Sequence, residues 1–430
     1  MDDAGKSSPG PRIYNLFPLL AGYFSHWTSH MQRAHAMGFN WIFVNPFQRP
    51  GYSGSIYSIA DHYDFDPRVV DRAAGAPQTQ LRAAIQQANA LGLNMMMDLV
   101  INHTAFDSPL LKQHPSWFKR GPDGNPIHPG ADEDGRRVVW GDLIEVDNAS
   151  NRDGLWQYWV DLALHYAAIG FTGFRCDAAY KVPQELWRTL IARVKQAYPR
   201  ALFFAESLGC PFDDTIKLAQ SGFDFIFNSS KWWDFAAPWC LEQYRQTSTL
   251  IPSISFPESH DTSRLAAELN ADRDAVKMRY AFAVLFATGV MIPIGFEYGF
   301  RRRLHVVETR PEDWEEPSWD ISEFIGSVNR LKQSRRLFNQ EGPIDLIALE
   351  NPDIFAFVKW SKDRRERALV LLNKDSRKRQ SFRLQSIGGF LASSARVEDV
   401  SPDGNLPHTP DFQTCFLEPS AAHVIWAQSA

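Results

Sequence analysis

Cysteine is scarce in this chain, with four among 430 residues and no CxxC spacing. That scarcity excludes a disulfide-stapled scaffold and a zinc–thiolate site, and it favours reduced thiols within the core. The chain also lacks any window of 18 uninterrupted apolar residues, so we expect no membrane span. Its first residues, MDDAGKSSPGPR, are polar and contain no apolar segment typical of a signal peptide. We therefore expect a cytoplasmic protein.

Charge of one sign is not concentrated anywhere in the sequence. Forty-five basic residues stand against fifty acidic ones, which gives a formal net charge of −5 without long runs of either sign. This balance argues against a nucleic-acid-binding surface and favours a neutral, polar partner. We find no low-complexity tract and no repeat of 20 to 50 residues, which excludes a solenoid.

Short apolar runs alternate with helical patterns from residue 12 to residue 340. Such alternation is typical of parallel βαβ units, and eight of them predict an α/β fold, a (β/α)8 TIM barrel. Amphipathic helices are expected over Gln80–Leu91 and Pro183–Tyr198. The eight expected strands are RIYNLFP, WIFVNP, LNMMMDLVIN, GFRCD, LFFAES, FDFIFN, SISFPESHD and VMIPIGFEYG.

Two further regions lie outside the simple alternation. Residues 104–150 are rich in proline, glycine and charge, and we predict a short rim subdomain that follows the third strand. After a helix expected over Ile321–Phe338, residues 341–430 show short alternating runs that predict a C-terminal antiparallel β domain. Residues 1–11 are expected to be a disordered N-terminus.

Polar residues close four of the expected strands. In a parallel barrel the strands are buried and function is built at their carboxyl ends, so these residues should converge on one rim. They are Asp98, Asn102 and His103 after the third strand, Arg175 and Asp177 in the fourth, Glu206 in the fifth, and Glu258, His260 and Asp261 in the seventh.

Arg175 and Asp177 are two residues apart, so both point to the same face of their strand. The arginine would lower the pKa of Asp177, which suits a nucleophile, whereas the apolar surroundings of Glu206 would raise its pKa and suit a proton donor. Two carboxyl groups with separated pKa values are what cleavage of a glycosidic bond requires. Taken alone, Arg175 and Asp177 fit a structural ion pair equally well.

The four strand ends resemble the four signature segments of the α-amylase superfamily, glycoside hydrolase family 13. The matching segments are DLVINH, GFRCDAAYK, FFAES and FPESHD, in the order of the family. The resemblance covers about residues 12–340, and GYSGSIYSIADHYDFDP resembles the family's segment that carries an aromatic platform for sugar.

The resemblance implies a retaining enzyme of α-glucans that works through a covalent glycosyl-enzyme. It implies Asp177 as nucleophile, Glu206 as general acid/base and Asp261 as the third catalytic acid. For this mechanism the carboxyl groups of Asp177 and Glu206 should lie about 5 to 5.5 Å apart. The substrate-binding set is expected to be Tyr57, Asp98, Asn102, His103, Arg175, Lys181 and His260.

Two other functions remain open at this stage. Segments such as GFRCDAAYKVPQELW and MIPIGFEYGF resemble maltosyltransferases that use maltose 1-phosphate, and the second alternative is a non-catalytic sugar-binding relative. Lys181 would bind an acceptor sugar or a phosphate in the first case, or would simply face solvent. The basic run Arg301–Arg303 could attract a phosphate, but we favour ion pairs with Glu308 and Glu312.

Metal and assembly are less well indicated by the sequence. The asparagine matching Asn102 is a calcium ligand in many amylases, and Asp142 would be a partner ligand. The rim segment does not supply the six to eight oxygens that calcium takes, so we predict no metal and no other cofactor. The expected partner is an α-glucan or maltooligosaccharide, with no nucleic acid and no membrane, and the sequence leaves the oligomeric state open.

Overall fold

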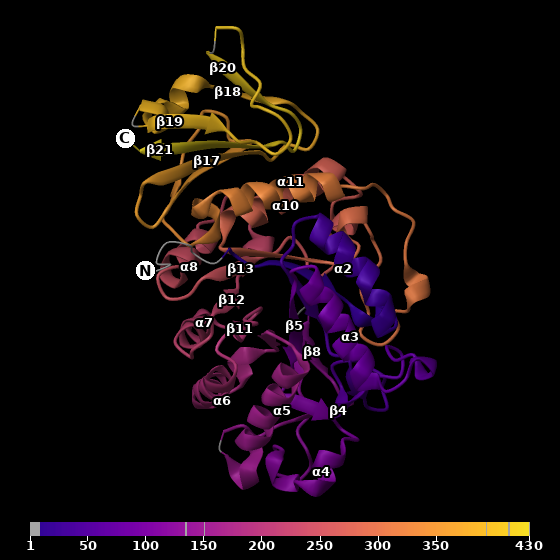
Figure 1. Cartoon of the computed structure of the whole chain (residues 1–430). Helices are drawn as coiled ribbons and strands as arrows, with labels where there is room; N and C mark the ends of the chain where they lie inside the picture. Colours follow the sequence, from indigo (N-terminus) through magenta and orange to yellow (C-terminus); the bar gives the residue numbers. More distant parts are fainter. Residues whose placement is uncertain (1–8, 134–135, 150, 393, 412, 430) are drawn as a thin grey trace, which may run out of the picture.

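Eight parallel strands close into a barrel in the computed structural model, which describes residues 9–133, 136–149, 151–392, 394–411 and 413–429 (Figure 1). The (β/α)8 architecture predicted from the sequence is confirmed. Around the barrel the strands are β1 (Arg12–Leu16), β2 (Trp41–Val44), β5 (Asn94–Leu99), β10 (Gly173–Cys176), β11 (Leu202–Ala205), β12 (Phe225–Phe227), β13 (Ser253–Ser255) and β14 (Gly289–Pro293), and β14 pairs with β1.

Helices cover the outside of the barrel. The longer ones are α2 (Trp27–Ala36), α3 (Pro77–Ala90), α5 (Leu155–Ile169), α6 (Gln184–Ala197), α7 (Phe212–Ala219), α8 (Trp239–Thr247), α10 (Arg273–Phe286) and α11 (Ser322–Ser334). Two shorter ones are α1 (Pro18–Ala21) and α9 (Leu265–Glu268), while α4 (Pro109–Gln113) lies in the segment after β5 and α12 (Gly388–Ala392) in the C-terminal region. None of the helices in the described part of the chain is both long and apolar enough to cross a membrane.

Burial along each helix follows its neighbours. In α6 the buried residues are Leu186, Trp187, Leu190, Ile191 and Val194, so one apolar stripe faces the strands. Helix α10 is buried almost all round over its second half, because the barrel lies on one side of it and the C-terminal domain on the other. That sandwiched position accounts for its lack of a polar face.

The barrel interior is filled by large side chains. Trp41, Phe43, Met96 and Phe204 belong to the interior cluster, as do five more apolar residues from the other strands. Gly173 makes room for them, because a Cβ atom there would lie 2.6 Å from the Trp41 ring and 3.0 Å from Met96. The barrel is therefore a packed core, and its function must lie at an end.

The segment after β5 forms the predicted rim subdomain. Its elements are the pair β6 (His103–Ala105) and β9 (Leu143–Glu145), the hairpin β7 (Gly130–Glu133) and β8 (Arg136–Val139), and helix α4. The hairpin β3 (Gln48–Pro50) and β4 (Ile59–Phe65) packs beside β6. Its helix α4 lies at the bottom of the molecule in Figure 1, far from the C-terminal domain.

The C-terminal residues form the predicted antiparallel β domain. Its main sheet has the order β15 (Ile344–Leu346), β16 (Ile354–Trp360), β17 (Glu366–Asn373), β21 (Ala422–Ser429) and β19 (Ser394–Asp399). A second pair, β18 (Gln380–Arg383) and β20 (Thr414–Leu417), packs over one face of it. The other face packs on α10 and α8 through an aromatic cluster that includes Trp233, Phe282 and Phe355.

Several details differ from the sequence-based expectations. The barrel strands end one to six residues before the expected runs do, so the polar residues mostly follow the strands. Strands β15 and β20 were not expected. The domain boundaries at residues 104, 150 and 340 stay predictions, and the expected disorder of residues 1–11 falls mainly on residues 1–8, outside the described residues.

Candidate active site

The predicted site residues come together at the carboxyl end of the barrel. Asp98 lies within β5 and Arg175 within β10, while Asp177 and Glu206 each follow the last residues of their strands. Arg175 pairs in register with Asp98 on one neighbouring strand and with Phe204 on the other. The remaining members lie outside the barrel strands. Tyr57 precedes β4, Asn102 precedes β6 and His103 is its first residue, Lys181 ends a short 3-10 helix after β10, and His260 and Asp261 follow β13.

Arg175 is the centre of the cluster. Its Nη1 donates to both carboxylate oxygens of Asp98, at 2.9 and 3.0 Å, and to Oδ1 of Asp177 at 2.7 Å. Its Nη2 lies 4.0 Å from Oε2 of Glu206 and 3.9 Å from Oδ2 of Asp261. Burial opposes the charge of Arg175, but Asp98 and the other acids outweigh it and raise the arginine's pKa well above its usual value. One buried guanidinium therefore holds four carboxyl groups together.

Alternate side chains of β10 point to opposite sides of the barrel wall, as the two-residue period of a strand predicts. Arg175 points into the barrel, where its guanidinium carbon lies 5.9 Å from the centre of the Phe43 ring. Phe174 and Cys176 point outward into the layer between strands and helices. The odd charge pair in this apolar strand thus belongs to the interior end of the barrel.

Asp177 is held as a carboxylate. Burial alone would raise its pKa, but Arg175, His103 and the hydrogen bonds from Arg175 and Asn102 bring the pKa below its usual value. Asn102 donates from Nδ2 to Oδ2 of Asp177 at 3.3 Å. The group is therefore ionised at neutral pH and able to act as a nucleophile.

Glu206 has the opposite protonation tendency. Burial is the main cause that raises its pKa to about 7, Asp177 and Asp261 raise it further, and Arg175 opposes the shift. Its Oε2 accepts from the backbone N–H of Ala178 at 2.7 Å, and its Oε1 accepts from that of Leu208 at 2.6 Å. Ala178 has a left-handed backbone with φ of 39°, so both the position and the proton affinity of this carboxyl group are set by its surroundings.

Tyr57, Asp98 and His260 form a buried chain beside the carboxyl groups. The Tyr57 hydroxyl donates to Oδ2 of Asp98 at 2.7 Å, and its oxygen lies 2.7 Å from Nε2 of His260. The two rings are stacked, with centroids 5.8 Å apart and planes 5° apart. Burial lowers the pKa of His260 to about 4, so the ring is neutral, and we assign its proton to Nε2 because the Tyr57 proton is committed to Asp98.

Asp98 itself is strongly affected by burial. Desolvation raises its pKa to about 7, against the opposing effects of Arg175 and the Tyr57 hydrogen bond. His103 closes the other side of this wall, where its Nε2 lies 3.1 Å from the Tyr57 carbonyl and burial lowers its pKa. These side chains therefore form a buried wall of the site.

Asp261 is the most accessible of the acids. Its side chain is 51% exposed, and His260 Nε2 lies 3.1 Å from its Oδ2. Arg303 donates to its backbone carbonyl at 2.8 Å. The side chain of Asp261 therefore reaches solvent at the opening of the site, while Arg303 fixes its backbone.

The other sequence candidates fall in different places. Lys181 is exposed, with its Nζ 5.9 Å from the centre of the Trp140 ring, so both of its proposed roles stay open. In the basic run, Arg302 pairs with Asp313 and the backbone of Arg301 bonds Glu315, so the acidic partners differ from those expected. Two adjacent tryptophans lie outside the predicted set: Trp233 is buried in the interdomain cluster, whereas Trp232 is 51% exposed.

Sequence reasoning missed two contributors to the site. Asn45 donates from Nδ2 to the Tyr57 hydroxyl at 3.0 Å, and Asn15 supports Asn45 with a bond of 2.8 Å. Both are polar residues near the carboxyl ends of β1 and β2, so the rule that found Asp98 would also have found them. The backbone donor of Ala178 carries no such signal, since it depends on conformation alone.

The fit to a metal is poor among the described residues. They contain no group of three or more His, Cys, Asp or Glu side chains that could hold an ion. Asn102 turns its amide nitrogen to Asp177 and leaves Oδ1 buried without a partner, while Asp142 accepts from the Ser53 hydroxyl at 2.6 Å. Two such oxygens are far from a calcium cage, and the metal-free expectation stays a prediction.

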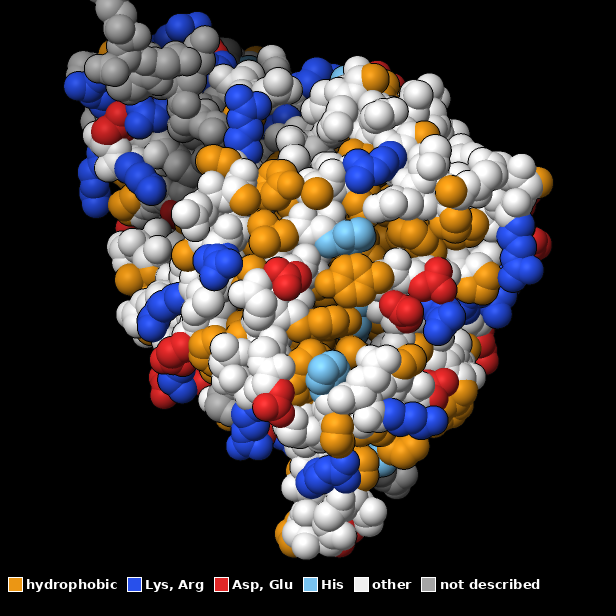
Figure 2. Space-filling view, turned by 60° about the horizontal axis from the view of Figure 1, so that its bottom comes forward, with side chains coloured by type: hydrophobic (Ala, Val, Ile, Leu, Met, Phe, Trp, Pro, Cys, Tyr) orange, Lys and Arg blue, Asp and Glu red, His pale blue; other side chains and the backbone are white. Residues whose placement is uncertain are grey.

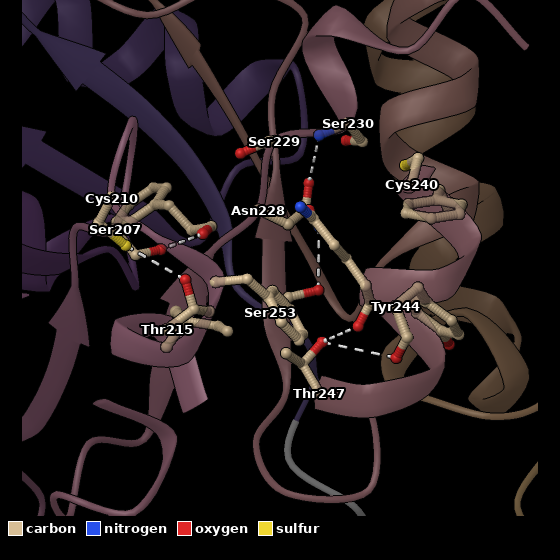
Figure 3. Close-up of a pocket in the computed structure, with 15 residues that line it drawn as sticks. Ser207, Cys210, Thr215, Asn228, Ser229, Ser230, Cys240, Tyr244, Thr247 and Ser253 are labelled. Atoms are coloured by element: carbon tan, nitrogen blue, oxygen red, sulfur yellow. Dashed lines mark hydrogen bonds between the residues drawn. The ribbon is translucent and has the colours of Figure 1, made fainter. Parts of the chain in front are cut away.

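A small polar cavity lies beside the β11–α7 loop, and none of the carboxyl groups described above lines it (Figure 3). It has a volume of about 50 Å³ and is lined by the β11–α7 loop, β12 and α8. Ser207 donates to the Phe227 carbonyl at 2.8 Å, and Asn228 bonds Ser253 at 3.0 Å. This volume is enough for a few water molecules but not for a sugar ring.

Comparison with known proteins finds one family model and several solved structures that are similar to this chain. Residues 12–118 match the family described as "Glycogen debranching enzyme, glucanotransferase domain". A crystal structure of an α-amylase from Lactobacillus plantarum superposes with a TM-score of 0.78 at 20% identity, over 97% of this chain and 98% of that one. That likeness establishes the fold.

The sequence relatives carry a different name. An α-1,4-glucan:maltose-1-phosphate maltosyltransferase of Burkholderia pseudomallei is 26% identical over 79% of this chain and 30% of its own length. One of Myxococcus xanthus is 23% identical over 93% of this chain and 64% of its own length. The chain thus spans from about a third to about two thirds of these relatives. The resemblance to the α-amylase superfamily indicated by the four motifs is confirmed, with maltosyltransferases among the relatives.

Proposed function

We propose that this protein cleaves α-glucosidic linkages of maltooligosaccharides or related α-glucans with retention, and passes the glycosyl group to water or to a sugar. The single observation that carries the proposal is the contrast between two neighbouring carboxyl groups. Asp177 after β10 has a lowered pKa, and Glu206 after β11 has one raised to about 7. A carboxylate and a carboxylic acid side by side are what a retaining glycosidase needs.

In the first step Asp177 attacks the anomeric carbon of the donor sugar. The bond from that carbon to the glycosidic oxygen breaks, its electron pair stays on the oxygen, and Glu206 gives its proton to that oxygen. A covalent glycosyl–Asp177 ester results. Arg175 keeps Asp177 ionised before the attack, and its charge also favours the departing carboxylate in the second step.

In the second step Glu206 acts as a base. It takes a proton from water or from an acceptor hydroxyl, whose oxygen attacks the anomeric carbon and displaces Asp177. The carboxylate of Asp261 offers negative charge to the oxocarbenium-like transition states of both steps. The neutral rings of Tyr57 and His260 give a flat wall on which the sugar packs.

A second candidate is transfer of maltosyl units from maltose 1-phosphate to a glucan. The names of the sequence relatives favour it, and Lys181 stands exposed beside Trp140 on the loop that follows Asp177. In this reaction the leaving group is phosphate, so an ammonium group near Glu206 would stabilise the departing charge.

The decisive experiment separates products. The protein is incubated with maltoheptaose, with and without inorganic phosphate, and the products are resolved by chromatography and anomer-specific NMR. Glucose and short maltooligosaccharides indicate hydrolysis, longer chains indicate transfer, and an α-linked sugar 1-phosphate that appears only with phosphate indicates the second candidate. Unchanged maltoheptaose in every mixture would refute an α-glucan enzyme.

We also propose that the protein works in the cytoplasm. All four cysteines are free thiols, and three of them are buried, which suits a reducing compartment. Cell fractionation with a periplasmic marker tests this placement.

A further inference from the structure

Exposed hydrophobic side chains gather on the rim subdomain and on the loop that packs against it. Tyr52 is 67% exposed, Phe106 38%, Ile127 36% and Val139 56%. Figure 2 shows hydrophobic and histidine side chains collected at the centre of the face that it presents, with Lys and Arg mostly around them. A concentration of this kind marks a binding surface more often than scattered single residues do.

Tyr52 is exposed but rigidly held. Its backbone N–H donates to Oδ2 of Asp107 at 3.1 Å, and its hydroxyl donates to the Gly141 carbonyl at 3.3 Å. Gly51 permits this close approach, because a Cβ atom there would lie 2.3 Å from Asp107 and 2.6 Å from Ala105. A ring fixed at both ends loses little conformational entropy when a ligand stacks on it.

Phe106 follows the same pattern in the turn just after β6. Its backbone N–H donates to the Asp142 carbonyl at 2.8 Å, and one side of its ring is supported by His128, with centroids 5.4 Å apart. His128 is fixed in turn by a contact of 2.7 Å from Nδ1 to the Leu143 carbonyl. The ring is therefore another preorganised apolar surface open to solvent.

The segment Trp140–Asp142 connects these rings to the catalytic cleft. The Trp140 ring lies under the ammonium group of Lys181, and Lys181 follows Asp177 by four residues. Asp142 accepts from Ser53 and, through its carbonyl, from Ser58, which flanks Tyr57. We call Tyr52, Phe106 and Trp140 the rim strip. Trp140 belongs to the segment Trp140–Asp142, and Tyr52 and Phe106 are hydrogen-bonded to that segment. The same segment contacts Ser58, next to Tyr57 of the site.

We propose that the rim strip is an accessory binding site for α-glucan chains, which extends the cleft along the rim and favours long chains over short oligosaccharides. The proposal rests on the function proposed above for its ligand class. The apolar faces of glucose rings stack on aromatic side chains, and the strip is continuous with the site that would hold the reacting sugar. Serial stacking of several glucose units gives long chains additional contacts that maltotriose cannot reach.

The test measures binding apart from turnover. In an Asp177→Asn background, Kd is determined by isothermal titration calorimetry for soluble amylose and for maltotriose, before and after Tyr52→Ala and Phe106→Ala. We expect each substitution to weaken amylose binding by about fivefold to tenfold, the scale of one lost stacking contact, with a much smaller effect on maltotriose. Tyr52→Phe, which keeps the ring and loses the hydroxyl, should retain most of the amylose affinity.

Tyr198→Ala is the matched control. Tyr198 is an aromatic residue 36% exposed, and it lies after α6, near the amino end of β11 and so at the opposite end of the barrel from the rim. It should change neither affinity. Thermal unfolding of every variant checks that the fold is intact.

The outcomes separate the two proposals. Unchanged amylose affinity in Tyr52→Ala and Phe106→Ala overturns the rim strip, and so does an equal loss for amylose and maltotriose, whatever the wild-type protein does catalytically. Amylose binding that depends on Tyr52 supports the strip even where the wild-type protein turns over no α-glucan, and in that case the catalytic proposal alone fails.

Discussion

The backbone N–H of Ala178 donates to Oε2 of Glu206 at 2.7 Å, which ties the loop after β10 to the end of β11. The loop that carries Asp177 therefore also positions the carboxyl group with which Asp177 would work. Since an N–H donor favours the ionised carboxylate, this bond offsets part of the burial that raises the pKa of Glu206. The result is a group near the middle of its titration at neutral pH, as general acid/base catalysis requires.

The pH dependence of turnover follows from these two pKa values. Activity should fall as pH rises through about 7, because Glu206 loses the proton that it must donate. It should fall on the acid side only below the usual pKa of an aspartate, because Asp177 is held ionised. A kcat/KM profile with an α-maltosyl fluoride, whose leaving group needs no proton, should lose the basic limb. A basic limb that persists with the fluoride would contradict the assignment of Glu206.

Stability should also depend on pH through the same group. The folded protein binds the Glu206 proton up to about pH 7, whereas the unfolded chain releases it near the ordinary glutamate pKa of 4.5. Between these values the native state binds more protons, so the free energy of unfolding decreases as pH rises. Glu206→Gln should flatten this slope in urea titrations at pH 5, 6 and 7. An unchanged slope would show that Glu206 is not protonated in the fold.

Asp177→Asn should abolish the chemistry and spare the fold. The amide has nearly the same shape and can still meet Arg175 and Asn102, but it cannot form the glycosyl ester. We expect kcat to fall at least about a thousandfold, with a melting temperature close to that of the wild type. Asp214→Asn, an exposed aspartate paired with Lys217, serves as control. Turnover that survives in Asp177→Asn would remove this residue as nucleophile.

Asp98→Asn tests whether the buried anchor of Arg175 is structural. Removing the charge leaves the guanidinium with one fewer anionic partner, and breaking a buried pair costs on the order of 3 kcal/mol. Because the folded pKa of Asp98 is raised from 3.8 to about 7, wild-type stability falls as pH rises through this range, so the loss caused by Asp98→Asn should be larger in urea unfolding at pH 6 than at pH 8. Asp64→Asn, half of an exposed pair with Arg49, should change stability by less than about 1 kcal/mol.

The sequence predicted the barrel because its strands are buried on both sides, which leaves continuous apolar runs, and because the polar exceptions stand where those runs end. The same pattern predicted that Asp177, Glu206 and Asp261 meet at one end of the barrel, and all three lie around Arg175. The pattern overestimated strand lengths. The run expected as the seventh strand extends to Asp261, but β13 pairs with its neighbours only over Ser253–Ser255. The end of a strand is set by its hydrogen bonds to neighbouring strands, and the hydropathy pattern does not report these bonds.

Other features could not be read from the sequence for a definite physical reason. The strands β15 and β20 have three and four residues, too few for a periodic pattern to be distinct from chance. The acidic partners of the basic run depend on how a long loop folds back, which brings Asp313 and Glu315 to Arg302 in place of Glu308 and Glu312. Tyr52 is exposed but fixed by hydrogen bonds to Asp107 and Gly141, which lie 55 and 89 positions further along the chain.

Adjacent tryptophans provide a last test, of the contact between barrel and C-terminal domain. Trp233 is 2% exposed, its ring packs on Phe355 of β16 with centroids 5.1 Å apart, and its Nε1 donates to the Ala237 carbonyl at 2.7 Å. Trp233→Ala opens a cavity in this interface and should destabilise the protein by about 3 to 5 kcal/mol in urea unfolding. Trp232→Ala, 51% exposed, is the matched control and should cost little stability. Because Trp233 is covered on all sides, its loss should weaken sugar binding only where the fold is lost. A stable Trp233→Ala variant with weakened maltotriose binding would contradict the packing role.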